Sequence, residues 1–152
     1  MKKLLIIFLF FSTPLFAEKI ERLGFYNLQE ILQDDNLTYK IIKGCVSLNS
    51  AVTEIIKEDH PNLAEEFFKS ANYLYPFGIL VLKKIKKTNR QAAEKEYFFS
   101  IDSLTKDYIN FMRENGIINK SFFKGTFLGD DLNFCNEIRA AIETTITDAK
   151  KK

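Results

Sequence analysis

The chain has 152 residues, with 22 Lys and Arg against 20 Asp and Glu, which gives a formal net charge of +2. Fifteen Phe and six Tyr, with no Trp, provide enough apolar volume for one domain with a substantial core. Both excess positive charges, Lys2 and Lys3, lie in the first 17 residues, and the remainder is formally neutral. A net basic face is therefore unsupported, and we expect no nucleic acid as partner.

Residues 1–17 have the layout of a secretory signal peptide. A basic start is followed by the apolar run 4–11, then by the helix breaker Pro14 and the small residue Ala17. The apolar run is far shorter than the roughly 20 residues that span a bilayer. We predict export to the periplasm or the medium, with cleavage after Ala17. The alternative is an uncleaved N-terminal anchor.

The domain after the predicted cleavage site, residues 18–150, opens with a short and then a long helix. Residues 27–35, "NLQEILQDD", predict about two helical turns, and Asp35 or Asn36 is the expected N-cap of the next helix, which should end near Asp59. Apolar residues at steps of three and four form one stripe on that long helix. The stripe consists of Ile41, Cys45, Leu48, Val52 and Ile55.

A second long helix is predicted to begin at Pro61, because a proline at the first helical position loses no hydrogen bond. Pro76 should kink or break this helix, since its ring clashes with the carbonyl of Asn72. On a helical wheel, residues 77–87 place an apolar arc opposite four lysines, which we interpret as a core face and a solvated face.

The last two helices are separated by an aromatic, glycine-containing stretch. Thr88 is the expected N-cap of the longest periodic run, which the pair Asn115–Gly116 should end. Residues 117–129 are predicted to be mostly irregular, and Asp130 or Asp131 should cap the final helix.

Two cysteines, Cys45 and Cys135, are the only ones in the chain. In an exported protein an even number of cysteines predicts a disulfide, and both residues fall on apolar helix faces. The alternatives are two buried free thiols or a reactive Cys45. No segment alternates with period two, so we predict an all-α single domain of about four main helices, kinked near Pro76 and joined by one disulfide.

No catalytic, metal or cofactor motif is evident. His60 is the only histidine, and a metal site needs several converging ligands. The acidic pairs Asp34–Asp35 and Glu65–Glu66 lie at predicted helix starts, where helix capping explains them more simply than catalysis. We therefore expect no cofactor and a non-enzymatic protein. A hydrolase that uses Cys45 or an acidic pair is the weaker alternative.

Three segments resemble a loose class of small exported helical proteins of proteobacteria: "KGCVSLNSAV", "NLAEEFFKSANYLYPFGILV" and "GDDLNFC". In that class an early helix carries one cysteine, and an acidic helix start late in the chain carries the second. The resemblance covers most of residues 18–150. It implies an exported, all-helical, one-disulfide protein and implies no activity.

We therefore expect a module of the cell envelope that binds a protein or peptide, and the alternative is a carrier of a lipid or other apolar ligand in a bundle cavity. Two stretches supply candidate contact residues, one beside the lysines and one in the aromatic loop. They are Ile79, Leu80, Lys83 and Lys84, and Phe122, Phe123 and Phe127. The first group suits a partner or weak contact with an anionic lipid surface. The second either binds a partner or plugs one end of the bundle.

Overall fold

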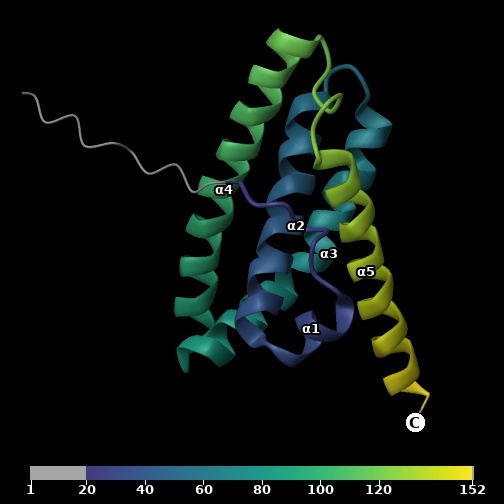
Figure 1. Ribbon diagram of the computed structural model, residues 1–152. Coiled ribbons are helices and arrows are strands. Elements are labelled where there is room, and N and C mark those ends of the chain that lie inside the picture. The colour runs from purple at the N-terminus through teal and green to yellow at the C-terminus, as the bar shows by residue number, and fades with distance from the viewer. Residues whose placement is uncertain (1–19, 152) are drawn as a thin grey trace, which may run out of the picture.

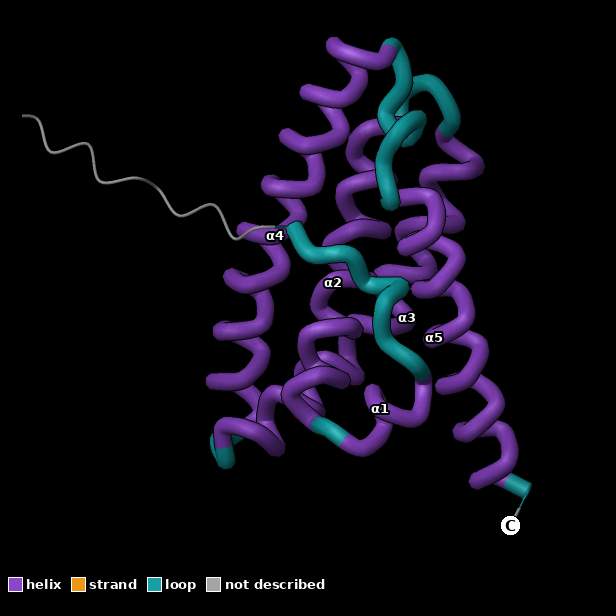
Figure 2. Tube along the Cα trace, in the orientation of Figure 1, coloured by secondary structure: helices purple, strands orange, loops and turns teal. Residues whose placement is uncertain are grey.

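The computed structural model describes residues 20–151 and is built of helices, without a strand in that range (Figures 1 and 2). The helices are α1 (Leu28–Gln33), α2 (Asp35–Ile56), α3 (Pro61–Lys86), α4 (Arg90–Asn119) and α5 (Leu128–Lys150). The all-α single domain is thereby confirmed. Within the described range no helix is both long and apolar enough to cross a membrane. The predicted signal peptide, residues 1–17, lies outside that range.

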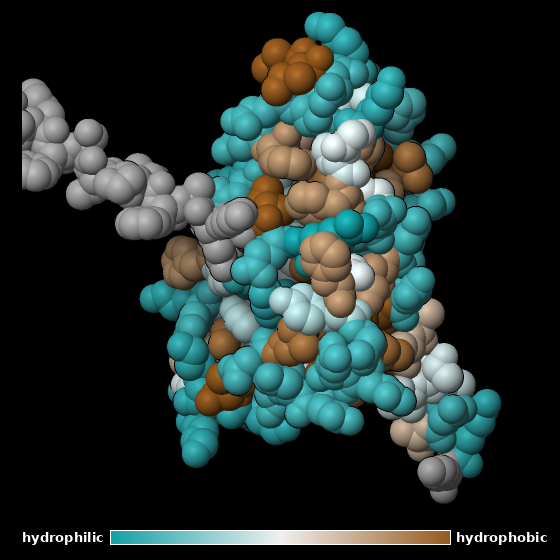
Figure 3. Space-filling view, viewed as in Figure 1, coloured by the Kyte–Doolittle hydropathy of each residue, from teal (hydrophilic) through white to brown (hydrophobic). Residues whose placement is uncertain are grey.

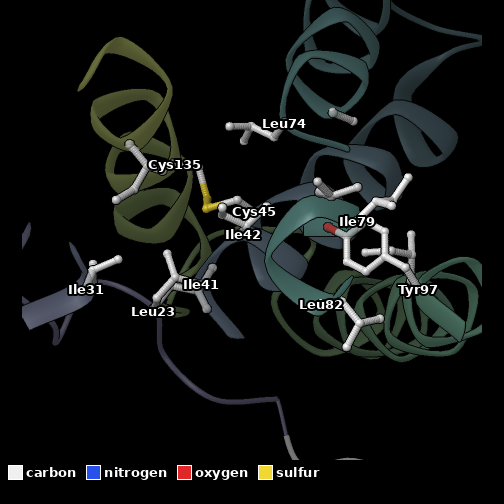
Figure 4. Packing of buried hydrophobic residues seen from close by; sticks show 14 of the residues in the cluster. Leu23, Ile31, Ile41, Ile42, Cys45, Leu74, Ile79, Leu82, Tyr97 and Cys135 are labelled. Carbon is white, nitrogen blue, oxygen red and sulfur yellow. A yellow bond between two sulfur atoms is a disulfide. The ribbon is translucent and has the colours of Figure 1, made fainter. Parts of the chain in front are cut away.

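Helix α2 is the centre of the bundle and packs against each of the other four helices. Ile41, Cys45, Leu48 and Val52 of its predicted stripe are buried, whereas Ile55 is only partly buried, and the helix connects two core clusters. One cluster surrounds Ile41, Leu74 and Tyr97 (Figure 4), and the other surrounds Leu48 and Tyr108. The predicted disulfide is confirmed, and both of its cysteines belong to the first core cluster. It joins Cys45 of α2 to Cys135 of α5, with both side chains fully buried and Cα atoms 5.4 Å apart.

Helices α2 and α4 begin at caps next to the predicted ones. Asp34, and not Asp35 or Asn36, accepts hydrogen bonds from backbone N–H groups of the first turn of α2. Asn89, and not Thr88, accepts one at the start of α4. Both true caps have extended backbone angles, which orient the side chain back toward the first turn. Neighbouring polar residues are almost equally good N-cap candidates in the sequence, and the backbone angles decide which of them caps the helix.

Helix α3 begins at Pro61 as predicted and continues without a break through Pro76, so the alternative of a chain break there is wrong. The kink stays a prediction.

Two residues after Pro76, Gly78 allows α3 to approach α4 closely, because a Cβ atom at Gly78 would lie 2.1 Å from both Cζ and the hydroxyl oxygen of Tyr97. Figure 4 shows the Tyr97 hydroxyl directed at α3. That hydroxyl has no hydrogen-bond partner among the described residues, and burial raises the pKa of Tyr97 far above its usual value.

Helix α4 does not end at Asn115–Gly116, as the sequence predicts, but continues for three more residues. Gly116 has ordinary helical geometry there, and its missing side chain makes room for the Phe122 ring, which a Cβ atom would approach to 3.0 Å. The Asn115 side chain donates hydrogen bonds to the carbonyls of Ser121 and Lys124, at 2.6 and 3.1 Å. The pair therefore organises the following loop and does not terminate the helix.

The prediction that Asp130 or Asp131 caps α5 is also wrong, because α5 begins before them and both lie within its first turn. Asp131 is fully buried, and its carboxylate oxygens accept hydrogen bonds from the backbone N–H groups of Leu23 and Gly24, each at 3.0 Å. Asp130 pairs with Arg22 at 2.7 Å on the surface. The two aspartates thus attach the segment that precedes α1 to the start of α5.

Burial raises the pKa of Asp131 above its usual value, and its two backbone donors and Arg22 oppose this shift only in part. The folded chain should therefore bind a proton at Asp131 at a higher pH than the unfolded chain does. This makes the free energy of unfolding fall as the pH rises from about 4, the usual aspartate pKa, through the raised folded pKa. We predict that wild type loses stability relative to Asp131→Asn over this range.

Urea denaturation of both proteins between pH 4 and pH 7 measures this difference, and Asp148→Asn is the control because its carboxylate is exposed near the other end of α5. A wild-type advantage that grows with pH would mean that the backbone donors keep Asp131 ionised, and would contradict the prediction. At any pH in this range, Asp131→Ala leaves the buried N–H of Leu23 and the part-buried N–H of Gly24 without their acceptor and should cost about 1–3 kcal/mol.

Candidate functional site: an apolar groove between α1, α3 and α5

A groove of about 380 Å³ lies between α1, α3 and α5, with the beginning of α2 at its base; we call it the apolar groove. Buried isoleucines from three helices form its floor, namely Ile31, Ile42 and Ile138. Exposed leucines, Leu32 from α1 and Leu80 from α3, form its rim. The volume is in the lower part of the range for ligand-binding clefts, about 300–1,000 Å³.

Helix α5 forms one wall of the apolar groove. Its apolar stripe continues past the part of the helix that packs against the bundle, so the end of the stripe faces the groove. Ile138, Ile142 and Ile146 follow one another at steps of four and therefore share one helix face. The disulfide at Cys135 ties the start of this stripe to α2. Beyond that point the last turns of α5 lean away from α1 and the rest of the bundle (Figure 1), so Ile142 and Ile146 remain only half-buried.

The opposite wall depends on α1, a helix of six residues that is fixed at both ends. The Asn27 side chain caps it by accepting a hydrogen bond from the backbone N–H of Glu30 at 2.9 Å. At its other end the Thr38 hydroxyl, from α2, donates to the carbonyl of Ile31. These contacts hold Leu28 and Leu32 at the rim, where both are exposed.

The side chains that line the apolar groove offer no free hydrogen-bond donor and carry no charge. Its two hydroxyls belong to Thr38 and Thr145, and both already donate to backbone carbonyls, that of Thr145 to Ala141 at 2.9 Å. Close by, Lys84 of α3 forms an ion pair with Asp35 of α2 at 2.7 Å. The groove therefore has the chemistry to cover apolar surface and lacks groups for acid–base or nucleophilic catalysis.

The structure places the residues of the first predicted contact group, the one beside the lysines of α3, in different environments. Leu80 lines the apolar groove, and Lys83 and Lys84 are exposed on α3. Ile79 is buried in the core, so its assignment to a surface patch is wrong. The reason is that α3 packs against α2 on one side and α4 on another, which buries a wider arc of its surface than a single partner would.

The second predicted contact group lies elsewhere, in the loop between α4 and α5. Phe123 and Phe127 pack against the second core cluster, and Phe127 contacts the Phe111 ring with 5.8 Å between centroids. Phe122 is more exposed and lines two wider depressions of about 820 and 720 Å³. The larger depression includes Arg113, and the smaller includes His60, so both have charged or polar rims that the apolar groove lacks.

The residues considered for catalysis either have structural roles or lie apart from other groups with which they could form a catalytic or metal site. Cys45 is in the disulfide, and no free cysteine occurs. Asp34 caps α2, and Glu65 pairs with Lys69 at 2.7 Å, which lowers the pKa of the Glu65 carboxyl. Within residues 20–151, no cluster of His, Cys, Asp and Glu side chains could hold a metal ion.

Sequence reasoning missed the α1 and α5 sides of the apolar groove. The available signal was that the apolar stripe of α5 continues about three turns past Cys135, through Ile142 and Ile146. Comparison of the chain with protein-family models, with curated proteins and with solved structures found no match. The functional argument therefore depends on the groove itself.

Proposed function

We propose that this chain is an exported, non-enzymatic protein of the cell envelope that binds the apolar face of a helical segment of another protein in the apolar groove. The observation that supports this proposal most strongly is an uncharged lining between two long helices whose side chains offer no free hydrogen-bond donor. Small-ligand sites usually contain a few polar groups that orient the ligand, whereas an amphipathic helix needs only apolar contact along its anchor residues.

Export and cleavage after Ala17 are proposed from residues 1–17, whose sequence has the layout of a signal peptide. Ile20 packs against the second core cluster, and Leu23 is buried. A cut after Ala17 would thus keep Ile20 and Leu23, with their core contacts, in the mature chain. The disulfide suits an oxidising compartment, where such bonds form and persist.

A pair of matched arginine substitutions on α3 tests the proposal. Leu80 lines the apolar groove, while Phe68 lies outside it, and their side chains are 54% and 53% exposed. Leu80→Arg places a charge where the partner's apolar face would lie, so we expect at least about a tenfold loss of affinity for the partner. Phe68→Arg should leave the affinity unchanged.

The measurement is affinity capture from envelope extract of the source cells with the wild type and both variants, followed by titration of the captured protein. A partner that Leu80→Arg loses and Phe68→Arg retains would support the proposal. Equal capture by all three proteins, or no captured protein at high coverage, would contradict it.

The alternative occupant is a lipid chain or other apolar small molecule, since the groove is large enough for one. Native mass spectrometry of the purified chain separates the two cases. An added mass of a few hundred daltons that Leu80→Arg removes would identify a carrier and contradict the proposal of a helical partner. A mass of two chains that depends on Leu80 would identify a second copy as the occupant.

A further inference from the structure

A second exposed apolar surface lies at the end of α4 and the beginning of the next loop, formed by Ile117, Ile118 and Phe122; we call it the α4 tip. Ile117 and Ile118 are 73% and 76% exposed, and Phe122 is 38% exposed. This end of α4 extends beyond the neighbouring helices, and a strongly hydrophobic patch is visible there (Figures 1 and 3). Two adjacent isoleucines exposed to this extent, with an aromatic ring nearby, form an apolar patch at a projecting end of the molecule.

Three exposed cations accompany the α4 tip. Arg113 and Lys120 line the same depression as Ile117, and Lys124 is in the loop. Within the described residues none of these three side chains forms an ion pair with a carboxylate. Glu114 is the acid next to them on α4, so the tip has a local positive excess.

Other charges at this end of the bundle lie on the connection between α2 and α3, where Glu58 and Asp59 are exposed, and at the start of α5, where Asp130 pairs with Arg22. Asp59 and Asp130 line the depression on the Phe122 side of the tip, whereas Arg113 and Lys120 line the other one. Figure 1 shows the connection between α2 and α3 set back from the end of α4. The most projecting part of the molecule at this end therefore combines apolar residues with cations.

The α4 tip is held in shape by the hydrogen bonds of the loop behind it. The Asn115 side chain donates to two loop carbonyls, and the Asn119 side chain donates to that of Asn115 at 2.6 Å. Lys120 ends α4 in the left-handed conformation, with φ of 56°. A preformed tip loses little conformational freedom on binding.

We propose that the α4 tip docks on the surface of an anionic lipid bilayer. Ile117 and Ile118 enter the boundary between headgroups and acyl chains, while Arg113, Lys120 and Lys124 face lipid phosphates. The projecting position of the tip favours a bilayer, because a flat extended surface can reach this end of α4 before it meets the neighbouring helices. This inference uses residues outside the apolar groove and does not depend on the function proposed for it.

Vesicle flotation tests the proposal with the purified chain, with phosphatidylcholine vesicles and with vesicles that also contain phosphatidylglycerol. We expect binding to the anionic vesicles that falls as salt is added, and weak binding to the neutral ones. Ile117→Ser/Ile118→Ser should reduce partitioning by about tenfold or more, because two apolar anchors are lost. The matched control is Phe98→Ser/Phe99→Ser on the same helix, with side chains 56% and 60% exposed, which should bind like wild type.

All variants carry the same N-terminus, so any contribution of residues 1–17 cancels in the comparison. Arg113→Gln/Lys120→Gln/Lys124→Gln is a second variant that keeps the apolar residues and should lose the preference for anionic vesicles. The proposal is overturned if wild type does not float with anionic vesicles, or if both tip variants float as well as wild type. It is also overturned if the tip variants change only self-association or capture of a protein.

Discussion

Replacing Cys45 and Cys135 together with alanine should lower the free energy of unfolding by about 3–5 kcal/mol. The bond closes a loop across a sequence separation of 90, so its loss restores much conformational freedom to the unfolded chain. Both side chains are fully buried, and alanine avoids placing an unsatisfied hydroxyl in the core. The same change should loosen α5, whose remaining described ties to the rest of the fold include those of Asp130 and Asp131.

Urea denaturation of oxidised wild type, reduced wild type and the double variant measures the effect. Reduced wild type should resemble the double variant, because both lack the bond. A loss of less than about 1 kcal/mol would mean that helix packing alone holds α5 in place, and would contradict the prediction.

Gly78→Ala should destabilise the fold by about 2–4 kcal/mol, although alanine is intrinsically the better helix former by about 1 kcal/mol. The new Cβ atom would lie 2.1 Å from Tyr97, a separation that requires the ring to move. Tyr97 is fully buried and has the rings of Tyr39 and Tyr75 at centroid distances of 5.8 and 5.1 Å. The ring has no free space to move into, so the steric cost should exceed the gain in helix propensity.

A double-mutant cycle with Tyr97→Ala isolates this contact. Tyr97→Ala alone should cost about 3–5 kcal/mol, and the Gly78→Ala/Tyr97→Ala variant should be more stable than the sum of the single changes by about 2 kcal/mol. Gly129→Ala is the control, because a Cβ atom at Gly129 in α5 would meet nothing within 4 Å. Strictly additive effects, or a neutral Gly78→Ala, would refute the close approach of α3 to α4.

The helices could be predicted because their apolar pattern is repeated along the chain, and the disulfide could be predicted because the chain has only two cysteines. The apolar stripe of α2 shows the period of a buried helix face several times over, so an error at one residue changes little. The pairing of Cys45 with Cys135 follows from there being only two cysteines. Such features depend on local periodicity and counting, which a single sequence contains.

The features that could not be predicted depend on contacts between distant segments. Asp131 resembles a helix cap in sequence, but its partners are Leu23 and Gly24, more than 100 residues away. Gly116 resembles a helix terminator, but it accommodates the Phe122 ring. Ile79 faces the lysine side of an isolated helix and is buried because a second neighbour covers it.

The apolar groove could not be predicted for a related reason. The hydrophobic pattern of α5 indicates which face is apolar and not how much of that face the bundle covers. Ile142 and Ile146 continue the stripe that begins at Ile138, and only the packing shows that they line an open groove. The feature of the sequence that corresponds to the site is therefore the apolar stripe that continues past Cys135, and its exposure is known only from the structure.

The most direct test of a helical partner in the apolar groove is photo-crosslinking in intact source cells. A photoreactive phenylalanine analogue at Leu32, on the rim, is compared with the same analogue at Phe25, outside the groove; these side chains are 73% and 74% exposed. We predict a crosslink to a protein from position 32 that Leu80→Arg abolishes, and none of the same mass from position 25. Equal crosslinks from both positions, or none from position 32, would contradict the account.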